Sequence, residues 1–169
     1  MLENPEHPYF YCVGLKGISI GKKTVPASRI LQRVNKRGDS GVVVDSGTTF
    51  KMLPAGFYNP VVAEFNRRVS RVHRRAREVE MKIGLSPCYY LNSATKVSVL
   101  KLHFVGVNSS VVLPRKNYFY EFLDSGDGLK KKGRVGFLML MNGGDEFENG
   151  GGPWAILGNY QHQGFEVEN

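Results

Sequence analysis

The stretch Gly41-Val-Val-Val-Asp-Ser-Gly-Thr-Thr-Phe50 decides how the rest of the chain is interpreted. Its three consecutive valines predict a short strand that is apolar on both faces and therefore central in a sheet. The strand ends in a carboxylate, Asp45, and Gly47 allows the backbone to bend and bring its own N–H towards it. Ser46 and Thr48 supply hydroxyls within reach. Such donors fix the orientation of a carboxylate and favour its charged form, as an acid–base pair requires.

Length and composition predict one globular domain with a core of its own. The chain has 169 residues, and its 20 glycines indicate many turns, which favours β structure over a helical bundle. The net charge of +8 indicates some attraction to polyanions. No apolar run reaches the roughly 18–20 residues of a membrane-spanning helix, so no membrane association is expected. The N-terminus lacks a signal-peptide pattern, so the protein is intracellular or this chain is part of a longer one.

Alternating apolar and polar residues predict strands on both sides of one helical segment. A hairpin turn is expected at Gly21–Lys23, and polar loops at 33–41, 123–133 and 143–153. The segments with a strand pattern are 9–21, 24–28, 42–45, 88–91, 97–106, 110–122, 134–142, 154–158 and 163–169.

The periodicity changes after Pro54 and predicts one long helix. Asn59 is suited to the N-cap and Pro60 to the first helical position, and Gly84 is suited to end the helix. Apolar residues recur at steps of three and four; they are Val62, Phe65, Val69, Val72, Ala76, Val79 and Ile83. The other face is basic and carries Arg67, Arg68, Arg71, Arg74, Arg75, Arg77 and Lys82. This face is either simply solvated or a site of weak, nonspecific DNA binding.

The order of these features resembles the pepsin-like aspartic proteases, especially their plant nucleoid-protease and nepenthesin-like branch. The D-S-G-T motif at Asp45 is followed far downstream by an apolar-apolar-Gly segment, Ile156-Leu157-Gly158. The similarity extends from about residue 5 to the end of the chain. Its matching segments are 9–26, 41–54, the helix, 84–91, 100–106 and 155–169.

The resemblance implies a mostly β fold with one long inserted helix, a single lobe of the bilobal acid-protease fold. Residues 1–169 would form the C-terminal lobe, without the N-terminal lobe and the final C-terminal strand. Asp45 would be the catalytic aspartate. Gly47 and Thr48 would donate hydrogen bonds to its carboxylate. Ser46 would join the hydroxyl network between the two lobes, and Thr49 would face the substrate. Ile156, Leu157 and Gly158 would pack beside the loop in a ψ-shaped arrangement. The family uses no cofactor or metal.

The sequence departs from the family pattern at three places. It has no second aspartate loop, because the tripeptides at Asp39 and Asp124 lie in polar, turn-rich contexts. The chain stops at Asn169, where family members continue into a last strand. The usual disulfide partner of Cys88 is replaced by Phe137-Leu138, and a bond from Cys88 to Cys12 stays open.

Three functions from different classes follow. The first is an aspartic endopeptidase acting on polypeptides, for which this lobe needs a second aspartate from the missing N-terminal lobe or from a second chain. The second is a non-catalytic relative of the plant xylanase inhibitors. The third is nucleic-acid binding through Arg67, Arg68, Arg71, Arg74 and Arg75. The parent family indicates the secretory pathway or the cell exterior, and a plastid location stays open.

Overall fold

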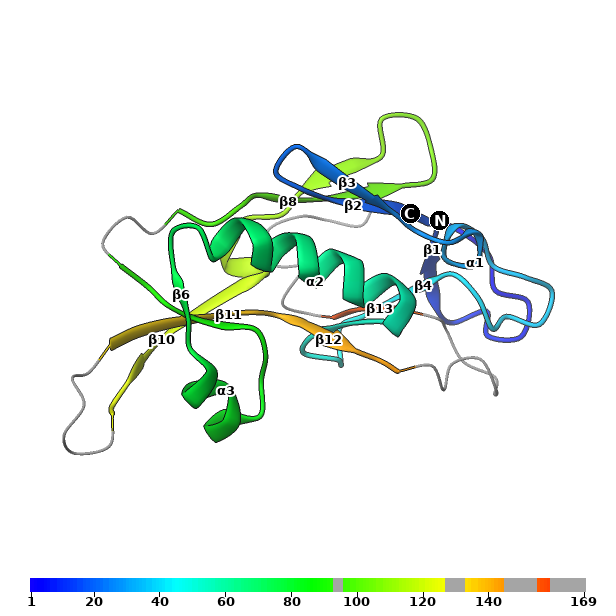
Figure 1. Ribbon diagram of the computed structural model, residues 1–169. Coiled ribbons are helices and arrows are strands. Elements are labelled where there is room, and N and C mark those ends of the chain that lie inside the picture. Colours follow the sequence, from blue (N-terminus) through cyan, green and yellow to red (C-terminus); the bar gives the residue numbers. More distant parts are fainter. Residues whose placement is uncertain (93–95, 127–132, 145–154, 159–169) are drawn as a thin grey trace.

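The computed structural model describes residues 1–92, 96–126, 133–144 and 155–158. Within them the chain is mostly β, with three sheets and one long helix, α2 (Ala55–Val69), inserted between strands (Figure 1). This confirms the fold class that the sequence predicts. The loop at 145–153, Trp154 and the strand expected at 163–169 lie outside the described residues.

The sheet that carries the GVVVD strand has five strands in the order β1-β4-β13-β5-β12. Its members are β1 (Tyr11–Val13), β4 (Val42–Asp45), β13 (Ala155–Gly158), β5 (Lys51–Leu53) and β12 (Leu140–Asn142). Strand β4 has neighbours on both sides, as its continuous apolar run predicts. It pairs antiparallel with β1 and parallel with β13.

Two four-stranded sheets complete the lobe, and a short helix and a 3₁₀ turn lie in connections from one sheet to another. One sheet has the order β3-β2-β8-β9 and consists of β3 (Lys23–Pro26), β2 (Leu15–Ile20), β8 (Leu100–Phe104) and β9 (Ser110–Val112). The other has the order β10-β11-β7-β6 and consists of β10 (Phe119–Asp124), β11 (Gly133–Leu138), β7 (Cys88–Tyr90) and β6 (Arg74–Arg75). The connecting turns are α1 (Arg29–Gln32) and η1 (Arg115–Asn117).

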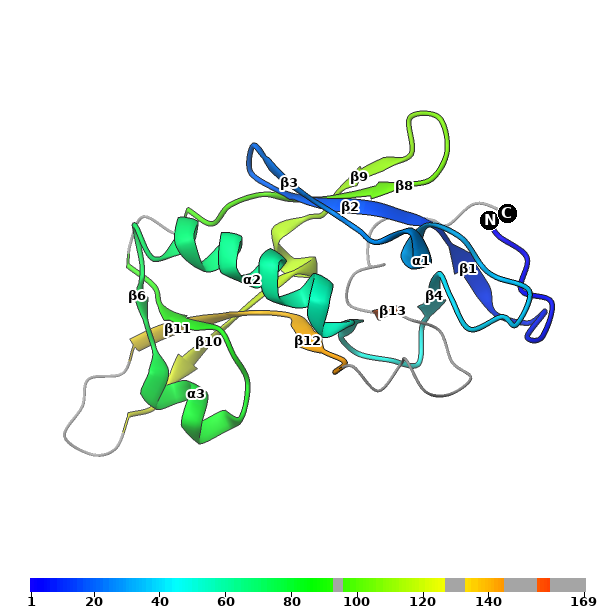
Figure 2. The ribbon, with the colours of Figure 1, turned by 45° about the vertical axis from the view of Figure 1, so that its right-hand side comes forward.

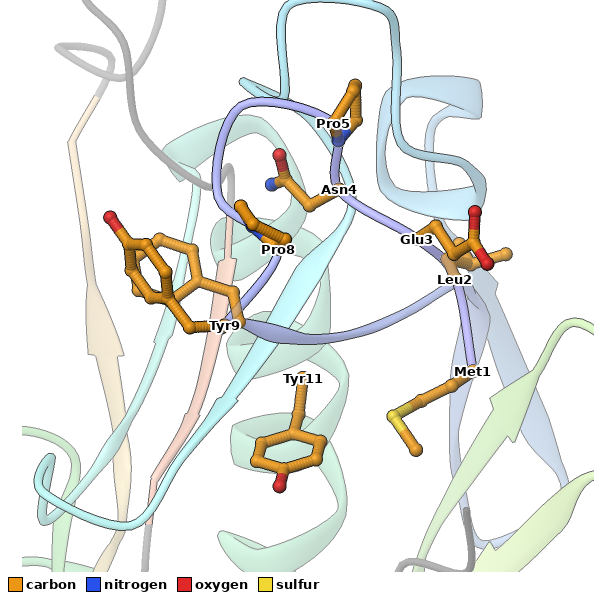
Figure 3. Close-up of a pocket in the computed structure, with 9 residues that line it drawn as sticks. Met1, Leu2, Glu3, Asn4, Pro5, Pro8, Tyr9 and Tyr11 are labelled. Carbon is orange, nitrogen blue, oxygen red and sulfur yellow. The ribbon is translucent and has the colours of Figure 1, made fainter.

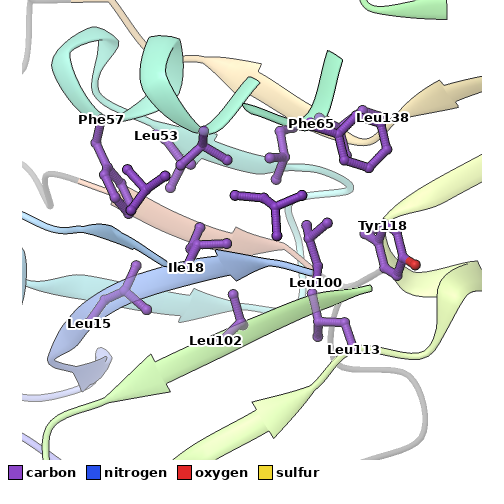
Figure 4. Close-up of a cluster of buried hydrophobic side chains, with 14 of the residues drawn as sticks. Leu15, Ile18, Leu53, Phe57, Phe65, Leu100, Leu102, Leu113, Tyr118 and Leu138 are labelled. Carbon is purple, nitrogen blue, oxygen red and sulfur yellow. The ribbon is translucent and has the colours of Figure 1, made fainter. Parts of the chain in front are cut away.

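The main hydrophobic core lies between α2 and the sheets. Figure 4 shows Phe57 and Phe65 of α2 together with Leu53 of β5, Ile18 of β2 and Leu100 of β8. All five side chains are buried, and α2 contacts β2, β3 and β12. Because strands of different sheets contribute to one cluster, burial of its apolar surface fixes the five-stranded sheet against the rest of the lobe.

The helical segment differs from the sequence prediction in its extent. The helix α2 ends at Val69, and the chain forms strand β6 before a second helix, α3 (Arg77–Ile83), follows. The apolar stripe is therefore divided: Phe65 and Val69 join the main core, whereas Ala76 and Val79 join a second cluster with Cys88. Pairing of β6 with β7 outweighs the helical period at this point.

The start of α2 also differs from the prediction. The helix begins at Ala55, after Pro54, and Pro60 lies inside it instead of at its first position. Proline cannot donate a backbone hydrogen bond to the residue four positions earlier. Burial of Phe57 and Val61 on either side of this position provides the packing that holds the helix. The other end of the segment is as predicted, because Gly84 caps α3 in the left-handed conformation with φ 71°.

The hairpin predicted at Gly21 is confirmed. Strands β2 and β3 pair antiparallel with Ile20 opposite Lys23, so two residues form the turn. Gly21 has φ 57°, a conformation that glycine adopts without strain. The loop predicted at 123–133 is shorter than expected, since β10 continues through Asp124 and β11 begins at Gly133.

Both cysteines are buried free thiols. Cys12 lies in β1, opposite Val43, and Cys88 lies in β7, opposite Phe137 of β11. The residue opposite Cys88 in β11 is thus a phenylalanine, which cannot form a disulfide bond with it. Burial raises the pKa of Cys88 to about 12. A thiol with so high a pKa carries almost no thiolate at neutral pH and is a poor nucleophile.

Candidate active site

Asp45 is the last residue of β4 and lies half-buried at the end of that strand. The preceding valines, Val42 and Val43, are buried in the sheet. The following residues, Ser46 and Gly47, form a turn and are exposed. The strand therefore carries the carboxylate from the core to the surface and presents it there in one orientation.

Both carboxylate oxygens of Asp45 accept hydrogen bonds from its own loop. The backbone N–H of Gly47 donates to Oδ1 at 2.8 Å, and the hydroxyl of Thr48 donates to Oδ2 at 2.6 Å. These are the two donors that the sequence predicts. Hydrogen bonds to a charged acceptor are stronger than neutral ones and favour the charged form.

Strand β13 lies directly against this loop. It runs between β4, to which it is parallel, and β5, to which it is antiparallel, and its register places Gly158 opposite Asp45. A Cβ atom on Gly158 would lie 2.6 Å from the carbonyl oxygens of both Thr48 and Phe50. Only glycine allows the loop to approach the strand so closely. Ile156 and Leu157 lie opposite Val43 and Val44 of β4, and the ψ-shaped arrangement that the resemblance implies stays a prediction.

The remaining predicted residues lie at the exposed side of the loop. Ser46 and Thr49 are exposed. The tripeptides at Asp39 and Asp124 lie elsewhere. Asp39 accepts a hydrogen bond from Asn35 within its own loop, and Asp124 ends β10, where it lies 3.7 Å from the amine of Lys82. Neither aspartate lies beside Asp45 in the five-stranded sheet.

One residue next to the loop was not identified from the sequence. Lys51 begins β5 and is fully buried, and its Nζ atom has no hydrogen-bond partner among the described residues. Burial lowers its pKa to about 7. The register of β5 places it beside Leu140 of β12. The only sequence signal is that a lysine occupies an inward position of the alternating segment Lys51–Leu53.

A hollow of about 700 Å³ lies at the N-terminal segment, next to the same sheet. Figure 3 shows Asn4, Tyr9 and Tyr11 among the residues that line it. The side chain of Asn4 donates to the carbonyl of Gly38 at 2.9 Å, which ties the segment to the loop before β4. Tyr11 pairs with Val44 across the strands, so the hollow is one strand away from the Asp45 loop and does not include it.

The basic residues of the predicted helix face do not share one face. Arg67 and Arg68 lie on α2, and both pair with Glu64, whose pKa falls to about 2, mainly through the hydrogen bond from Arg67. Arg75 lies on β6 and pairs with Glu80. Because the segment is divided into α2, β6 and α3, its charges are distributed over three elements, and part of them is compensated locally.

The described part of the chain contains no cluster of three or more His, Cys, Asp or Glu side chains suited to a metal ion. None of its helices is both long and apolar enough to span a bilayer.

An aspartate at the end of a central strand, held by its own loop and by a glycine-ended strand between two others, defines one lobe of a pepsin-like acid protease. The family described as xylanase inhibitor C-terminal matches residues 10–168. The chain therefore belongs to the plant pepsin-like aspartic protease family and carries its C-terminal domain.

The chain is similar to several curated plant proteases. A probable aspartyl protease of Arabidopsis thaliana is 66% identical over 167 residues, which are 99% of this chain and 34% of that protein. Aspartyl protease family protein 2 of the same plant is 32% identical over 170 residues, 99% of this chain and 31% of that protein. Aspartic proteinase nepenthesin-2 of Nepenthes gracilis is 26% identical over 109 residues, 63% of this chain and 24% of that protein. The chain thus spans about a third or less of the length of these relatives.

Solved structures support the fold. The crystal structure of edgp matches with a TM-score of 0.69 at 17% identity, over 91% of this chain and 35% of that chain. Conglutin gamma, a basic 7S globulin from lupine seeds, matches with a TM-score of 0.63 at 14% identity, over 90% of this chain and 33% of that chain. At such identities the similarity concerns the fold alone.

Proposed function

We propose that this lobe supplies one of the two aspartates of an aspartic endopeptidase that hydrolyses polypeptides. The observation that carries the proposal is the geometry of Asp45. A half-buried carboxylate at the end of a buried strand accepts hydrogen bonds on both oxygens, from Gly47 and Thr48. The identity of the curated relatives as aspartic proteases supports the same activity.

The proposed chemistry needs two carboxylates within hydrogen-bond distance of each other. Two such groups cannot both be charged at low cost, so they share one proton. The charged carboxylate takes a proton from a bound water, which attacks the peptide carbonyl, while the protonated carboxyl donates to the carbonyl oxygen. The pKa values of this reaction belong to the pair. In this chain, Gly47 and Thr48 hold the plane of the Asp45 carboxylate, and the exposed Thr49 faces the substrate.

The second aspartate comes from outside this lobe. Asp39 accepts a hydrogen bond within its own loop, and Asp124 of β10 lies beside Lys82 of α3. We therefore assign the second carboxylate to an N-terminal lobe or a second chain, and the isolated lobe is inactive. Passage through the secretory pathway or export from the cell is part of this proposal, with a plastid as the alternative.

The test is cleavage of a denatured protein substrate at acid pH by the full-length gene product. We expect pepstatin-sensitive cleavage that Asp45→Asn reduces by about 10²–10⁴-fold, the usual contribution of an acid–base group. Asp39→Asn is the matched control, since it makes the same change in the D-S-G tripeptide of the loop before β4, and it should leave the rate unchanged. Full activity of Asp45→Asn would refute the proposal.

A second candidate is a non-catalytic, xylanase-binding function. It is favoured by the description of the matching family as the C-terminal domain of xylanase inhibitors. In that case the full-length protein would inhibit a xylanase and would not cleave proteins. Asp45→Asn would leave this inhibition intact. Proteolysis that depends on Asp45, with no inhibition of xylanase, excludes this candidate.

Nucleic-acid binding through Arg67, Arg68, Arg71, Arg74 and Arg75 is a third proposal of lower rank. Arg67 and Arg68 lie on α2, Arg71 lies in the turn after it, and Arg74 and Arg75 form β6. Contacts from these residues would be to phosphates and independent of sequence. Filter binding of DNA at two salt concentrations tests it. No retention at low salt would end the idea.

A further inference from the structure

The turn between β8 and β9 carries a sequence motif that the proposed protease function does not use. Asn108-Ser109-Ser110 is the one Asn-X-Ser/Thr triplet without a central proline in the 169 residues. This triplet is the acceptor pattern for N-linked glycosylation, which requires an accessible asparagine on a surface loop.

The structure places Asn108 at the tip of this turn. The hairpin extends outward from the sheet, away from β4 and β13 (Figure 2). Asn108 is exposed, and the described residues offer its side-chain amide no hydrogen bond. Its φ of 55° is left-handed, a conformation that asparagine tolerates better than most residues. The side chain of the preceding Val107 is 92% exposed.

The third residue of the triplet has a place of its own in the fold. The hydroxyl of Ser110 lies 2.8 Å from Nδ1 of His103, directly across the β8–β9 pair. The Nε2 atom of the same ring lies 2.6 Å from the hydroxyl of Ser19 on β2. Ser110 is therefore engaged in the folded lobe, while Asn108 projects beyond this network and remains accessible.

We propose that Asn108 is an N-glycosylation site and that its sugar covers the apolar edge of the β3-β2-β8-β9 sheet. In the transfer, Nδ2 of Asn108 forms a bond to the anomeric carbon of an oligosaccharide donor linked to a lipid pyrophosphate. The bond between that carbon and the pyrophosphate oxygen breaks, the pyrophosphate leaves with the electron pair, and the amide gives up one proton. Passage through the secretory pathway is a condition of the proposal.

The edge beside the turn gives the sugar a physical role. Strand β9 is at the end of its sheet, so one side of it has no strand partner among the described residues. Val105 and Val107 of the turn are 44% and 92% exposed, and Val112 of β9 is 57% exposed. An unpaired edge strand with apolar side chains invites pairing with another chain. A bulky, hydrophilic group at Asn108 prevents such an approach.

Mass spectrometry of the full-length gene product from plant cells tests the modification. Trypsin releases residues 102–115, bounded by Lys101 and Arg115, as one peptide that contains the triplet. We expect this peptide to carry a glycan. Treatment in heavy-oxygen water with a peptide N-glycosidase that accepts plant glycans should leave labelled aspartate at position 108. An unmodified peptide in the purified protein overturns the proposal.

Four variants separate the triplet from the fold around it. Asn108→Asp and Ser110→Ala should abolish the glycan. Ser110→Thr keeps both the acceptor pattern and a hydroxyl near His103, and Ser109→Ala changes only the central residue, so both should retain it. A glycan on the Ser110→Ala peptide would contradict recognition of this triplet.

The covering role has a separate readout. We expect enzymatic removal of the glycan, or Asn108→Asp, to increase the self-associated fraction in size-exclusion chromatography. Val107→Lys in the Asn108→Asp background should restore the monomer, because a charge at the tip opposes edge pairing. If the deglycosylated protein remains monomeric, the covering role is wrong while the modification stands.

Discussion

Asp45 and Lys51 lie six positions apart in the sequence and on the two strands that flank β13, yet their surroundings are opposite in kind. Asp45 is half-buried, and both of its oxygens accept hydrogen bonds from its own loop. Lys51 is fully buried, and its amine has no hydrogen-bond partner among the described residues. The first group is held in one orientation by local donors. Burial lowers the pKa of the second group and so favours its neutral form.

The difference shows that two ionisable groups of one segment can have opposite effects, one on function and one on stability. The strand end at Asp45 opens to the solvent, where the proposed protease function requires a carboxylate in a fixed orientation. The inward position of Lys51 lies beside Leu140, where an ammonium ion has no compensation within the described chain. Asp45 is thus suited to function, whereas Lys51 reduces the stability of the lobe. The predictions below follow from this contrast.

Replacing Lys51 should produce the largest change in stability. The pKa of this lysine falls from 10.5 to about 7. At 1.36 kcal/mol for each pKa unit, charging it inside the folded lobe costs up to about 5 kcal/mol. Lys51→Met keeps an unbranched chain at the site and removes the charge, so it should raise the free energy of unfolding by up to that amount at neutral and acid pH. Urea denaturation of the full-length protein at pH 6 measures the difference. Equal stability of the two proteins would show that the amine has a partner.

The same site predicts a specific pH dependence. Because the pKa of Lys51 is lower in the folded state, the unfolded chain binds more protons between pH 7 and pH 10.5. The stability of the wild-type protein, measured relative to Lys51→Met, should therefore rise with pH across this window and stay constant below it. Denaturation series from pH 6 to pH 10 measure the gap, which should narrow as the pH rises. A gap that does not change with pH would contradict the role of burial.

Much of the aspartate site can be predicted from the sequence because its donors are local. Asp45, Gly47 and Thr48 lie within four residues, so the composition of the turn already determines which groups can reach the carboxylate. The central position of β4 follows in the same way from its valines. These features depend on no distant contact.

The features that escape prediction depend on distant contacts. The helical period continues past Val69, but the pairing of β6 with β7 breaks it, and no pattern within the segment reports that pairing. The burial of Lys51 likewise depends on β12, which comes from residues 140–142. Local propensity is overridden wherever a strand or core formed elsewhere in the chain takes up the segment.

Removing one donor to Asp45 should lower the activity without unfolding the lobe. Thr48→Val keeps the shape of the side chain but loses the hydroxyl that donates to Oδ2 at 2.6 Å. A hydrogen bond to a charged group contributes about 1.5–3 kcal/mol. The rate of proteolysis at acid pH should fall roughly tenfold to a hundredfold. Thr48→Ser retains the hydroxyl and is the matched control, which should keep most of the activity. A loss of equal size in both variants would show that the methyl group, and not the hydrogen bond, is important.

The smallest of these effects is expected at the strand that holds the loop. A methyl group on Gly158 would lie 2.6 Å from two backbone carbonyl oxygens, those of Thr48 and Phe50, and backbone yields less readily than a flexible side chain. Gly158→Ala should therefore cost about 1–3 kcal/mol of stability, as overpacking usually does. It should also displace the donors of Asp45, so its activity at a temperature where it remains folded should fall as well. Gly56→Ala is the control, because a methyl group on that helical glycine meets no atom within 4 Å. If Gly158→Ala lowers the stability but leaves the activity intact, β13 is not needed to position the loop. The orientation of Asp45 then depends on its hydrogen bonds from Gly47 and Thr48 alone.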